Sequence, residues 1–147
     1  MKINVELDPT SKEIEVVIKT NELTTEVNDL IKKLSTTNHN MIAGFRNDVV
    51  QMIDTTHIIR IYAFDKKVFA MLTTGEEFVI RMPLYELENR LDDKAFVRIS
   101  NSEIVSLKAI KELDLSFIGT IAMTLKNGET VYVSRRYVSK IKKVLGL

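Results

Sequence analysis

The first 39 residues combine a strand-like and a helix-like arrangement of apolar positions. Met1–Leu7 alternates apolar and polar side chains with period two, as a half-buried strand does, and Asp8-Pro9 ends it. Glu13–Ile18 has the composition of a partner strand. Apolar residues then recur at helical spacing, namely Leu23, Val27, Leu30, Ile31 and Leu34. The pattern predicts a ββα unit over residues 1–39, with a polar linker at Ser35–Asn40.

From residue 40 onward the pattern is typical of short strands closed by turns. Gly75 suits a hairpin turn because glycine tolerates positive φ, and Asn127-Gly128 is a strong hairpin signal. The strands predicted are Ile42–Phe45, Val49–Ile53, Ile58–Phe64, Val68–Leu72, Glu77–Ile80, Ile121–Leu125 and Thr130–Val133.

Two helices interrupt or end this run of strands. Pro83 suits the first position of a helix whose apolar stripe is Leu84, Leu87 and Leu91. The last helix is expected to start after Ser134, a good N-cap, and to end near Gly146. Residues 40–147 are therefore predicted to form a mainly β domain with few helices, which makes the whole chain α+β.

One polar stretch is not typical of a buried strand or of a loop that only connects two strands. Five hydrogen-bonding side chains, those of Arg98, Ser100, Asn101, Ser102 and Glu103, lie between the apolar pairs Phe96-Val97 and Ile104-Val105. A buried segment would not carry so many polar groups, and strand formers flank it closely on both sides. This pattern indicates polar groups presented to a partner. Farther along, Leu115–Ile118 fits a buried corner or an exposed hydrophobic edge equally well.

The net charge of +1 hides an uneven distribution along the chain. Residues 96–147 carry 9 Lys/Arg against 4 Asp/Glu, whereas residues 1–39 carry 5 against 7 and residues 40–95 carry 7 against 9. A basic C-terminal third favours a polyanionic partner. The alternative is a lysine-rich helix whose charges are only solvated.

Composition and motifs exclude several classes of protein. The chain has no cysteine for disulfides or thiolate ligands, and neither His39 nor His57 has a second ligand at metal spacing. It has no P-loop, no G-x-S-x-G element and no apolar run long enough to span a membrane. We therefore expect a cytoplasmic protein that is not an enzyme and uses no metal, cofactor or small-molecule substrate.

Two motifs in the second half resemble the LytTR-type DNA-binding domain of bacterial transcriptional regulators. The segment LYELENRLDDKAFVRISNSEIVSL contains the F-x-R-x-x-x-S element as Phe96, Arg98 and Ser102. The segment LKNGETVYVSRRYVSKIKKVLG contains N-G as Asn127-Gly128 and V-S-R-x-Y as Val133–Tyr137. The resemblance covers Met41–Leu147, and the motifs come in the family's order.

The resemblance implies an elongated stack of small antiparallel sheets that contacts DNA through loops in the major groove. Many members carry a receiver domain, but the first 39 residues are too short for one, so the chain resembles the stand-alone subgroup with a short extension. Phosphorylation control is not expected for such a chain. The family also implies direct-repeat DNA sites, binding as a pair and, for stand-alone relatives, an antagonist membrane protein.

The resemblance places the family's base-contacting asparagine at Asn101. Its carboxamide offers a donor and an acceptor side by side, which matches the N6/N7 edge of adenine. The alternative is that Asn101 only adopts a left-handed turn conformation. Ser100 and Ser102 have short hydroxyls suited to phosphate oxygens or to fixing the turn.

Arg136 is the second candidate for base contact. It is expected two residues into the last helix, where its guanidinium could fork onto guanine O6/N7 while Ser134 or Arg135 holds a phosphate. Lys140 lies on the same helix face as Arg136, whereas Val138, Ile141 and Leu145 form the face predicted to pack inward. The alternative is a solvated basic face.

The turn Asp65-Lys66-Lys67 corresponds to a family loop that contacts bases or phosphates. Either Lys66 or Lys67 can occupy that position, and a lysine there favours phosphate contact. Arg98 is expected to support the Asn101 loop or to contact a phosphate.

The sequence therefore predicts a sequence-specific, double-stranded DNA-binding transcription regulator. The small ββα unit cannot bury much surface alone, so we expect it to mediate dimerisation or signal input. The alternative is a non-enzymatic protein-interaction module that keeps the β scaffold and has lost DNA binding, which the acidic first two thirds would suit.

Overall fold

The computed structural model describes residues 1–36 and 40–147, except for the side chains of Ser35 and Thr36. The chain divides into two compact units, Met1–Ser35 and Thr36–Leu147. Part of the predicted linker Ser35–Asn40, including His39, lies outside the described residues.

The first unit contains one helix, α1 (Thr25–Thr36), and no strand. The prediction of a ββα unit is therefore wrong for its two strands and right for its helix. Apolar side chains in both segments are exposed, and those of Ile3 and Ile14 are more than four fifths exposed. An isolated two-stranded hairpin is marginal in water, so alternation without a third strand or a covering layer does not suffice to form one.

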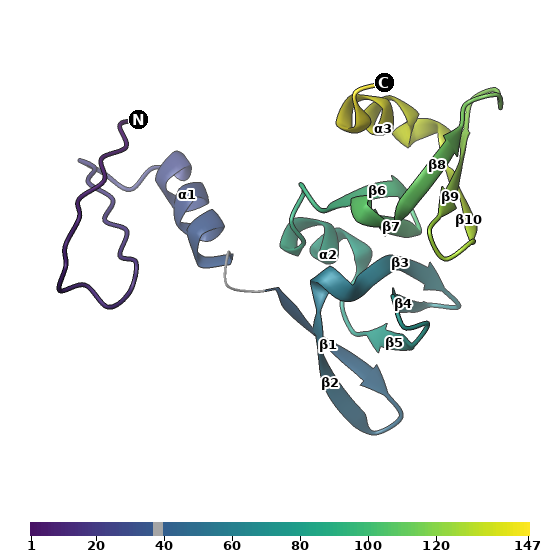
Figure 1. Cartoon of the computed structure of the whole chain (residues 1–147), viewed down its shortest axis with the longest axis horizontal. Coiled ribbons are helices and arrows are strands. Elements are labelled where there is room, and N and C mark those ends of the chain that lie inside the picture. The colour runs from purple at the N-terminus through teal and green to yellow at the C-terminus, as the bar shows by residue number, and fades with distance from the viewer. Residues whose placement is uncertain (37–39) are drawn as a thin grey trace. The chain divides into compact units, whose positions relative to one another are not determined.

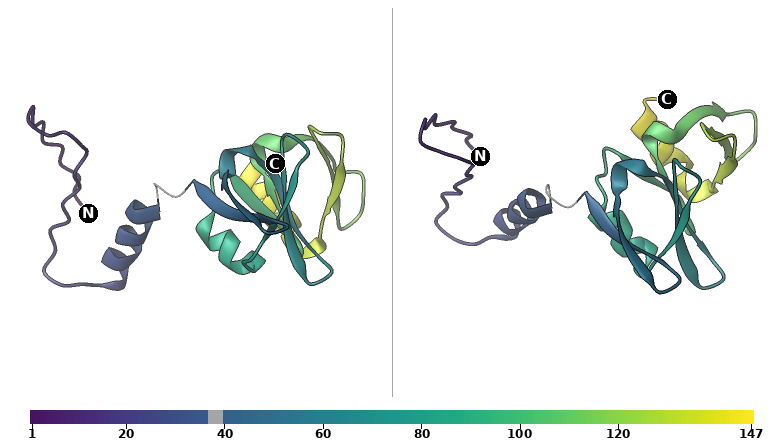
Figure 2. Two further views of the ribbon diagram at one scale, coloured as in Figure 1. Left: turned by 90° about the horizontal axis from the view of Figure 1, so that it is seen from below. Right: turned by 60° about the horizontal axis from the view of Figure 1, so that its bottom comes forward.

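The described residues of the second unit form ten strands in two antiparallel sheets, which confirms the predicted mainly β fold class. Its strands are β1 (Met41–Arg46), β2 (Val49–Asp54), β3 (Ile58–Phe64), β4 (Lys67–Leu72), β5 (Glu77–Ile80), β6 (Phe96–Ser100), β7 (Glu103–Ser106), β8 (Ile110–Asp114), β9 (Ile121–Leu125) and β10 (Thr130–Val133). The larger sheet has the order β2-β1-β5-β4-β3-β7-β6 and the smaller one β10-β9-β8. In Figures 1 and 2 the β1–β2 hairpin and the β8–β10 sheet lie at opposite ends of this unit.

Two hydrophobic cores lie on opposite faces of strands β6 and β7, as the alternation of a pleated strand requires. Phe96 and Ile104 belong to the core that includes helix α2 (Leu84–Arg90), whereas Val97 and Val105 belong to the core that includes β8–β10 and helix α3 (Val138–Leu145). The predicted inner stripes are confirmed: α2 buries Leu84, Leu87 and Leu91, and α3 packs Val138, Ile141 and Leu145 inward.

The elements that the sequence did not predict are short. Strand β8 mixes charged and apolar residues without alternation, and its pairing with β9 is irregular between Ile110 and Glu112. Within the part of the chain that the structure describes, three 3-10 turns connect or extend the elements, at Thr55–His57, Leu107–Ala109 and Arg135–Tyr137. Leu115–Ile118 follows β8 and is exposed, so of the two predicted alternatives the structure supports the exposed hydrophobic edge.

We predict that Ile141→Ala lowers the free energy of unfolding by about 2–4 kcal/mol, because a fully buried side chain leaves a cavity between α3 and the sheets. Val144→Ala on the same helix, at a position that is 44% exposed, should cost less than about 1 kcal/mol. Urea unfolding followed by circular dichroism measures both. Equal losses for the two variants would contradict the assigned inner face.

Candidate nucleic-acid interface

Three polar segments that are far apart in the sequence lie at one edge of the second unit. They are the β3–β4 turn (Asp65-Lys66), the β6–β7 turn (Asn101-Ser102) and the 3-10 turn Arg135–Tyr137. Strand β3 is antiparallel to both β4 and β7, so its end and the start of each partner fall at the same edge. We call these three segments together the polar edge.

Two hydrogen bonds connect the parts of the polar edge. The N–H of Ala63, near the end of β3, donates to the carbonyl oxygen of Ser102 at 2.8 Å. The hydroxyl of Tyr137 donates to Oδ1 of Asn101 at 3.2 Å. The structure therefore places the base-contact candidates Asn101 and Arg136, which adjoins Tyr137, on the same side of the unit.

Arg98 holds the backbone of the Asn101 turn. Its Nε donates to the carbonyl oxygen of Ser100 at 2.7 Å, and its Nη2 donates to the carbonyl oxygen of Asn101 at 2.6 Å. The side chain is only 11% exposed, because Nη1 also pairs with Glu88 of α2 at 2.7 Å. Of the two roles expected for Arg98, the structure supports loop support over phosphate contact.

Glu88 also contacts the last helix. Its second carboxylate oxygen lies 3.5 Å from Nζ of Lys140, which remains half exposed. Glu88 thus joins α2 to the Asn101 turn through Arg98 and, more weakly, to α3 through Lys140. The pattern of the sequence did not indicate Glu88, because its partners are 10 and 52 positions away.

The two serines bond to each other across the turn. The hydroxyl oxygens of Ser100 and Ser102 lie 3.2 Å apart, and the N–H of Ser102 donates to the hydroxyl of Ser100 at 3.2 Å. These contacts support the turn-fixing role, one of the two alternatives for these residues. The carboxamide of Asn101 extends from this fixed turn and is exposed.

A charged cluster lies on the other flank of the turn. Glu103, the first residue of β7, pairs with Arg60 of β3 at 2.8 Å, and Arg60 also pairs with Glu129 at 2.5 Å. Burial raises the pKa of Glu103 above the ordinary glutamate range, and the positive charge of Arg60 only partly offsets that effect. Arg60 Nε and Glu103 Oε2 are buried and have no hydrogen-bond partner within the part of the chain that the structure describes.

The two lysines of the β3–β4 hairpin are both exposed. Asp65 and Lys66 have φ values of 49° and 61°, the left-handed geometry of a two-residue hairpin turn, and Lys67 is the first residue of β4. Among the described residues, neither lysine has an acidic partner within 4 Å. Both ammonium groups are therefore available to an anion, and the structure does not select between them.

The last helix begins later than the sequence predicts. The segment Arg135–Tyr137 is a 3-10 turn and α3 starts at Val138, so Arg136 precedes the helix instead of lying inside its first turn. Ser134 comes before the turn without a side-chain capping bond, while its N–H donates to the carbonyl oxygen of Ile99 at 2.9 Å. This backbone bond ties the segment to β6, which explains why the regular helix is delayed.

Arg135 and Arg136 are exposed, and within the described residues neither forms an ion pair. The guanidinium of Arg135 lies against Gly119: a Cβ at that glycine would meet its Nε at 3.0 Å. Gly119 has a φ of 75°, a backbone conformation that favours glycine, and a Cβ there would also displace the Arg135 guanidinium.

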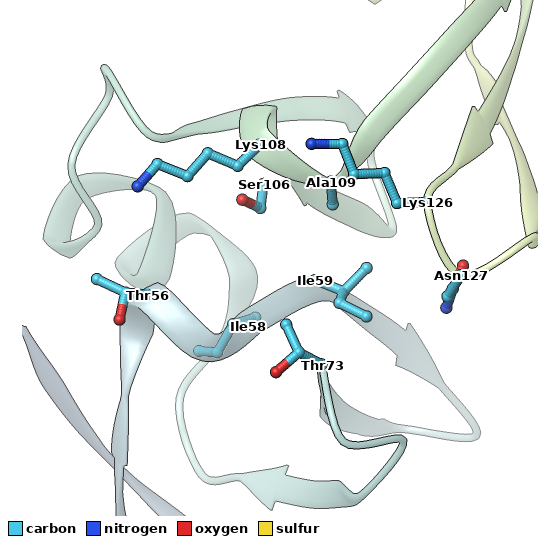
Figure 3. Close-up of a pocket in the computed structure, with 9 residues that line it drawn as sticks. All are labelled: Thr56, Ile58, Ile59, Thr73, Ser106, Lys108, Ala109, Lys126 and Asn127. Carbon is cyan, nitrogen blue, oxygen red and sulfur yellow. The ribbon is translucent and has the colours of Figure 1, made fainter.

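A separate cavity of about 250 Å³ lies at the opposite end of β3. In Figure 3, among the residues that line the cavity, Lys108 and Lys126 lie above Ile58 and Ile59. Ile58, which lines this cavity, is the first residue of β3, whereas the Asp65-Lys66 turn follows the last residue of β3. The cavity is therefore not part of the polar edge. The described residues contain no group of three or more His, Asp or Glu side chains that could hold a metal, and no helix among them is long and apolar enough to cross a membrane.

We predict that Glu103→Gln weakens the pH dependence of stability. Because the folded state raises the pKa of Glu103, its contribution to stability is complete below the pKa of an unfolded glutamate and is lost as pH rises through the folded pKa. A glutamine does not ionise, so the part of the decrease in unfolding free energy that Glu103 causes should be absent from the variant. Urea unfolding curves recorded between about pH 4 and about pH 7 measure this difference. Glu112→Gln, on the exposed strand β8, controls for removal of a carboxylate. A wild-type slope in Glu103→Gln would contradict the prediction.

Comparisons with known proteins agree with this architecture. The family model described as the LytTr DNA-binding domain matches residues 48–146. Two uncharacterised HTH-type transcriptional regulators of Staphylococcus aureus, from strains NCTC 8325 / PS 47 and COL, are each 30% identical to this chain over 148 residues, covering 100% of this chain and 99% of theirs. The solved LytTr DNA-binding domain of a Bacillus cereus protein is 25% identical, with a TM-score of 0.71 over 75% of this chain and 100% of that one. The chain belongs to the LytTR DNA-binding domain family.

Proposed function

We propose that this protein is a sequence-specific, double-stranded DNA-binding transcription regulator that contacts the major groove through loops. The observation that carries this proposal is the polar edge, where three sequence-distant segments meet and where Tyr137 bonds Asn101. Membership of the family and the names of the relatives, which are transcriptional regulators, support it.

Asn101 and Arg136 supply the base contacts in this proposal. Both are exposed, and the backbone around Asn101 is held by Arg98 and by the serine pair, so little conformational entropy is lost on binding. A carboxamide matches the N6/N7 edge of adenine, and a free guanidinium matches O6/N7 of guanine.

The exposed cations around these residues supply affinity that is independent of base sequence. Lys66, Lys67 and Arg135 have no acidic partner within the described residues, so each can replace a counterion at a phosphate. Lys140 is half exposed and only weakly tied to Glu88, which makes it a fourth phosphate contact.

We further propose that the protein binds direct-repeat sites as a homodimer, with residues 1–36 providing self-association. Loops contact only a few base pairs each, so two copies are needed for a longer site. Support comes from the exposed apolar residues of this segment, including Val5, Leu7 and Val17, which are more than three fifths exposed. A second copy can supply the strand partners and the covering layer that the single chain lacks.

We predict that Asn101→Ala and Arg136→Ala each weaken binding to the specific site by about 1–3 kcal/mol and relax base preference at one position. Lys66→Asn should weaken binding to all sequences alike and reduce the salt slope by about 1, because asparagine tolerates the left-handed turn and removes only the charge. Gel shifts on the promoter region of the protein's own gene, with sequence variants and a salt series, measure these effects.

The controls separate DNA binding from other causes. Glu112→Gln is remote from the polar edge by topology and should bind like the wild type. Wild-type affinity in both Asn101→Ala and Arg136→Ala would disprove the base-contact assignment. A protein that shifts no genomic fragment at low salt would favour the protein-interaction module instead.

We predict that replacing Val5, Ile14 and Val17 together by aspartate weakens self-association at least about 100-fold, because each buried aliphatic side chain contributes about 1.5–3 kcal/mol. A matched control adds the same three charges at polar positions, namely Asn4, Ser11 and Thr20. Sedimentation equilibrium of the full chain measures the dissociation constant. If both triple variants dimerise like the wild type, the segment is not the interface.

A further inference from the structure

The hydrogen bond between Tyr137 and Asn101 joins residues 36 positions apart, and it involves the functional end of each side chain. Tyr137 is half buried, and its ring packs against the core that contains Val133 and Ile141. A tyrosine ring has only two rotatable side-chain bonds, so packing fixes the position of its hydroxyl. The phenol therefore provides a stationary donor beside an exposed carboxamide.

This donor makes the two orientations of the Asn101 carboxamide unequal. The terminal torsion of asparagine is broad and roughly two-fold, so an unconstrained carboxamide can exchange its oxygen and nitrogen. A phenol hydroxyl can donate or accept, but it donates more strongly because its oxygen lone pairs are delocalised into the ring, so the Tyr137 hydroxyl favours the orientation that directs Oδ1 toward it, at 3.2 Å. Within the described residues, no other hydrogen bond involves the Asn101 side chain, so this single contact decides which atom faces outward.

We propose that Tyr137 is a positioning residue that sets base specificity by holding the amide group of Asn101 outward as a donor. This inference rests on the proposed function. An outward Nδ2 donates to N7 of a purine, and the second lone pair of Oδ1 stays available to the N6 amino group of adenine, whereas cytosine offers only its N4 donor in the major groove. The protein then rejects cytosine at the base pair that Asn101 contacts.

Tyr137 also connects the proposed base contact of Asn101 to that of Arg136. Tyr137 directly follows Arg136 in the same 3-10 turn, and Ser134 ties that turn to Ile99 of β6. The hydroxyl bond thus closes a ring of contacts from β6 through the turn to Asn101. The Tyr137 hydroxyl therefore joins the turn that carries Arg136 to the side chain of Asn101.

Tyr137→Phe in the full chain tests the proposal, because it keeps the packed ring and removes only the donor. The base pair read by Asn101 is first located as the position whose preference Asn101→Ala loses. Dissociation constants are then measured on the preferred site, on a site with cytosine at that position and on a non-specific duplex. We expect the preference against cytosine to fall about 3- to 10-fold, the worth of one neutral hydrogen bond, with non-specific affinity unchanged.

Two further variants give the test its controls. Tyr132→Phe removes the hydroxyl of an exposed tyrosine on β10 that forms no hydrogen bond to other described residues, and it should behave like the wild type. The double variant Asn101→Ala/Tyr137→Phe should discriminate no less than Asn101→Ala alone, because Tyr137 acts only through Asn101.

Each remaining outcome overturns the inference in a distinguishable way. If Asn101→Ala loses discrimination and Tyr137→Phe keeps it, Tyr137 does not position the carboxamide, while the proposed function stands. If Tyr137→Phe weakens specific and non-specific binding equally, together with a lower urea midpoint, its role is only structural. If Asn101→Ala has no effect on base preference, both the inference and the base-contact assignment fail.

Discussion

The antiparallel pairing of β3 with both β4 and β7 is the constraint on which the candidate site depends. It brings the end of β3 next to the start of β4 and of β7, so two turns that are 36 residues apart open at the same edge. Ile61 and Ile104, paired across β3 and β7, are almost wholly buried, and a slip of one residue would turn them to the opposite face. Core burial thus holds the register, and the register holds the polar edge together.

Six arginines and lysines of this domain fall into two groups that differ in burial and in pairing. Arg60 and Arg98 are largely buried and paired with glutamates, where a missing partner would leave an uncompensated charge. Lys66, Lys67, Arg135 and Arg136 are exposed and, among the described residues, have no acidic partner. Net charge alone cannot reveal this division, because the paired and the exposed cations count equally in it. The proposed DNA-binding surface includes cations that have no acidic partner among the described residues.

The first 36 residues contain apolar side chains that folding of the single chain leaves exposed. Their alternating apolar positions have the local pattern of strands, yet the structure forms only α1 there. A helix satisfies its backbone hydrogen bonds within its own segment, whereas a strand needs neighbours to satisfy them. The segment therefore carries strand-forming sequence without strand partners, which is the physical basis for the proposal that it mediates self-association.

The sequence by itself determined the elements whose signals are local: the hairpins around Gly75 and Asn127-Gly128, and the buried stripes of α2 and α3. Motif resemblance also selected Asn101 and Arg136, both of which the structure exposes on one side. Only the tertiary structure decided that Glu88 holds Arg98 and that Tyr137 holds Asn101, because those pairs meet across separate elements. The start of α3 and the irregular strand β8 were likewise decided by contacts with β6 and β9. Periodicity and turn chemistry specify strands and turns, whereas contacts between distant side chains depend on register and packing, which a single sequence does not display.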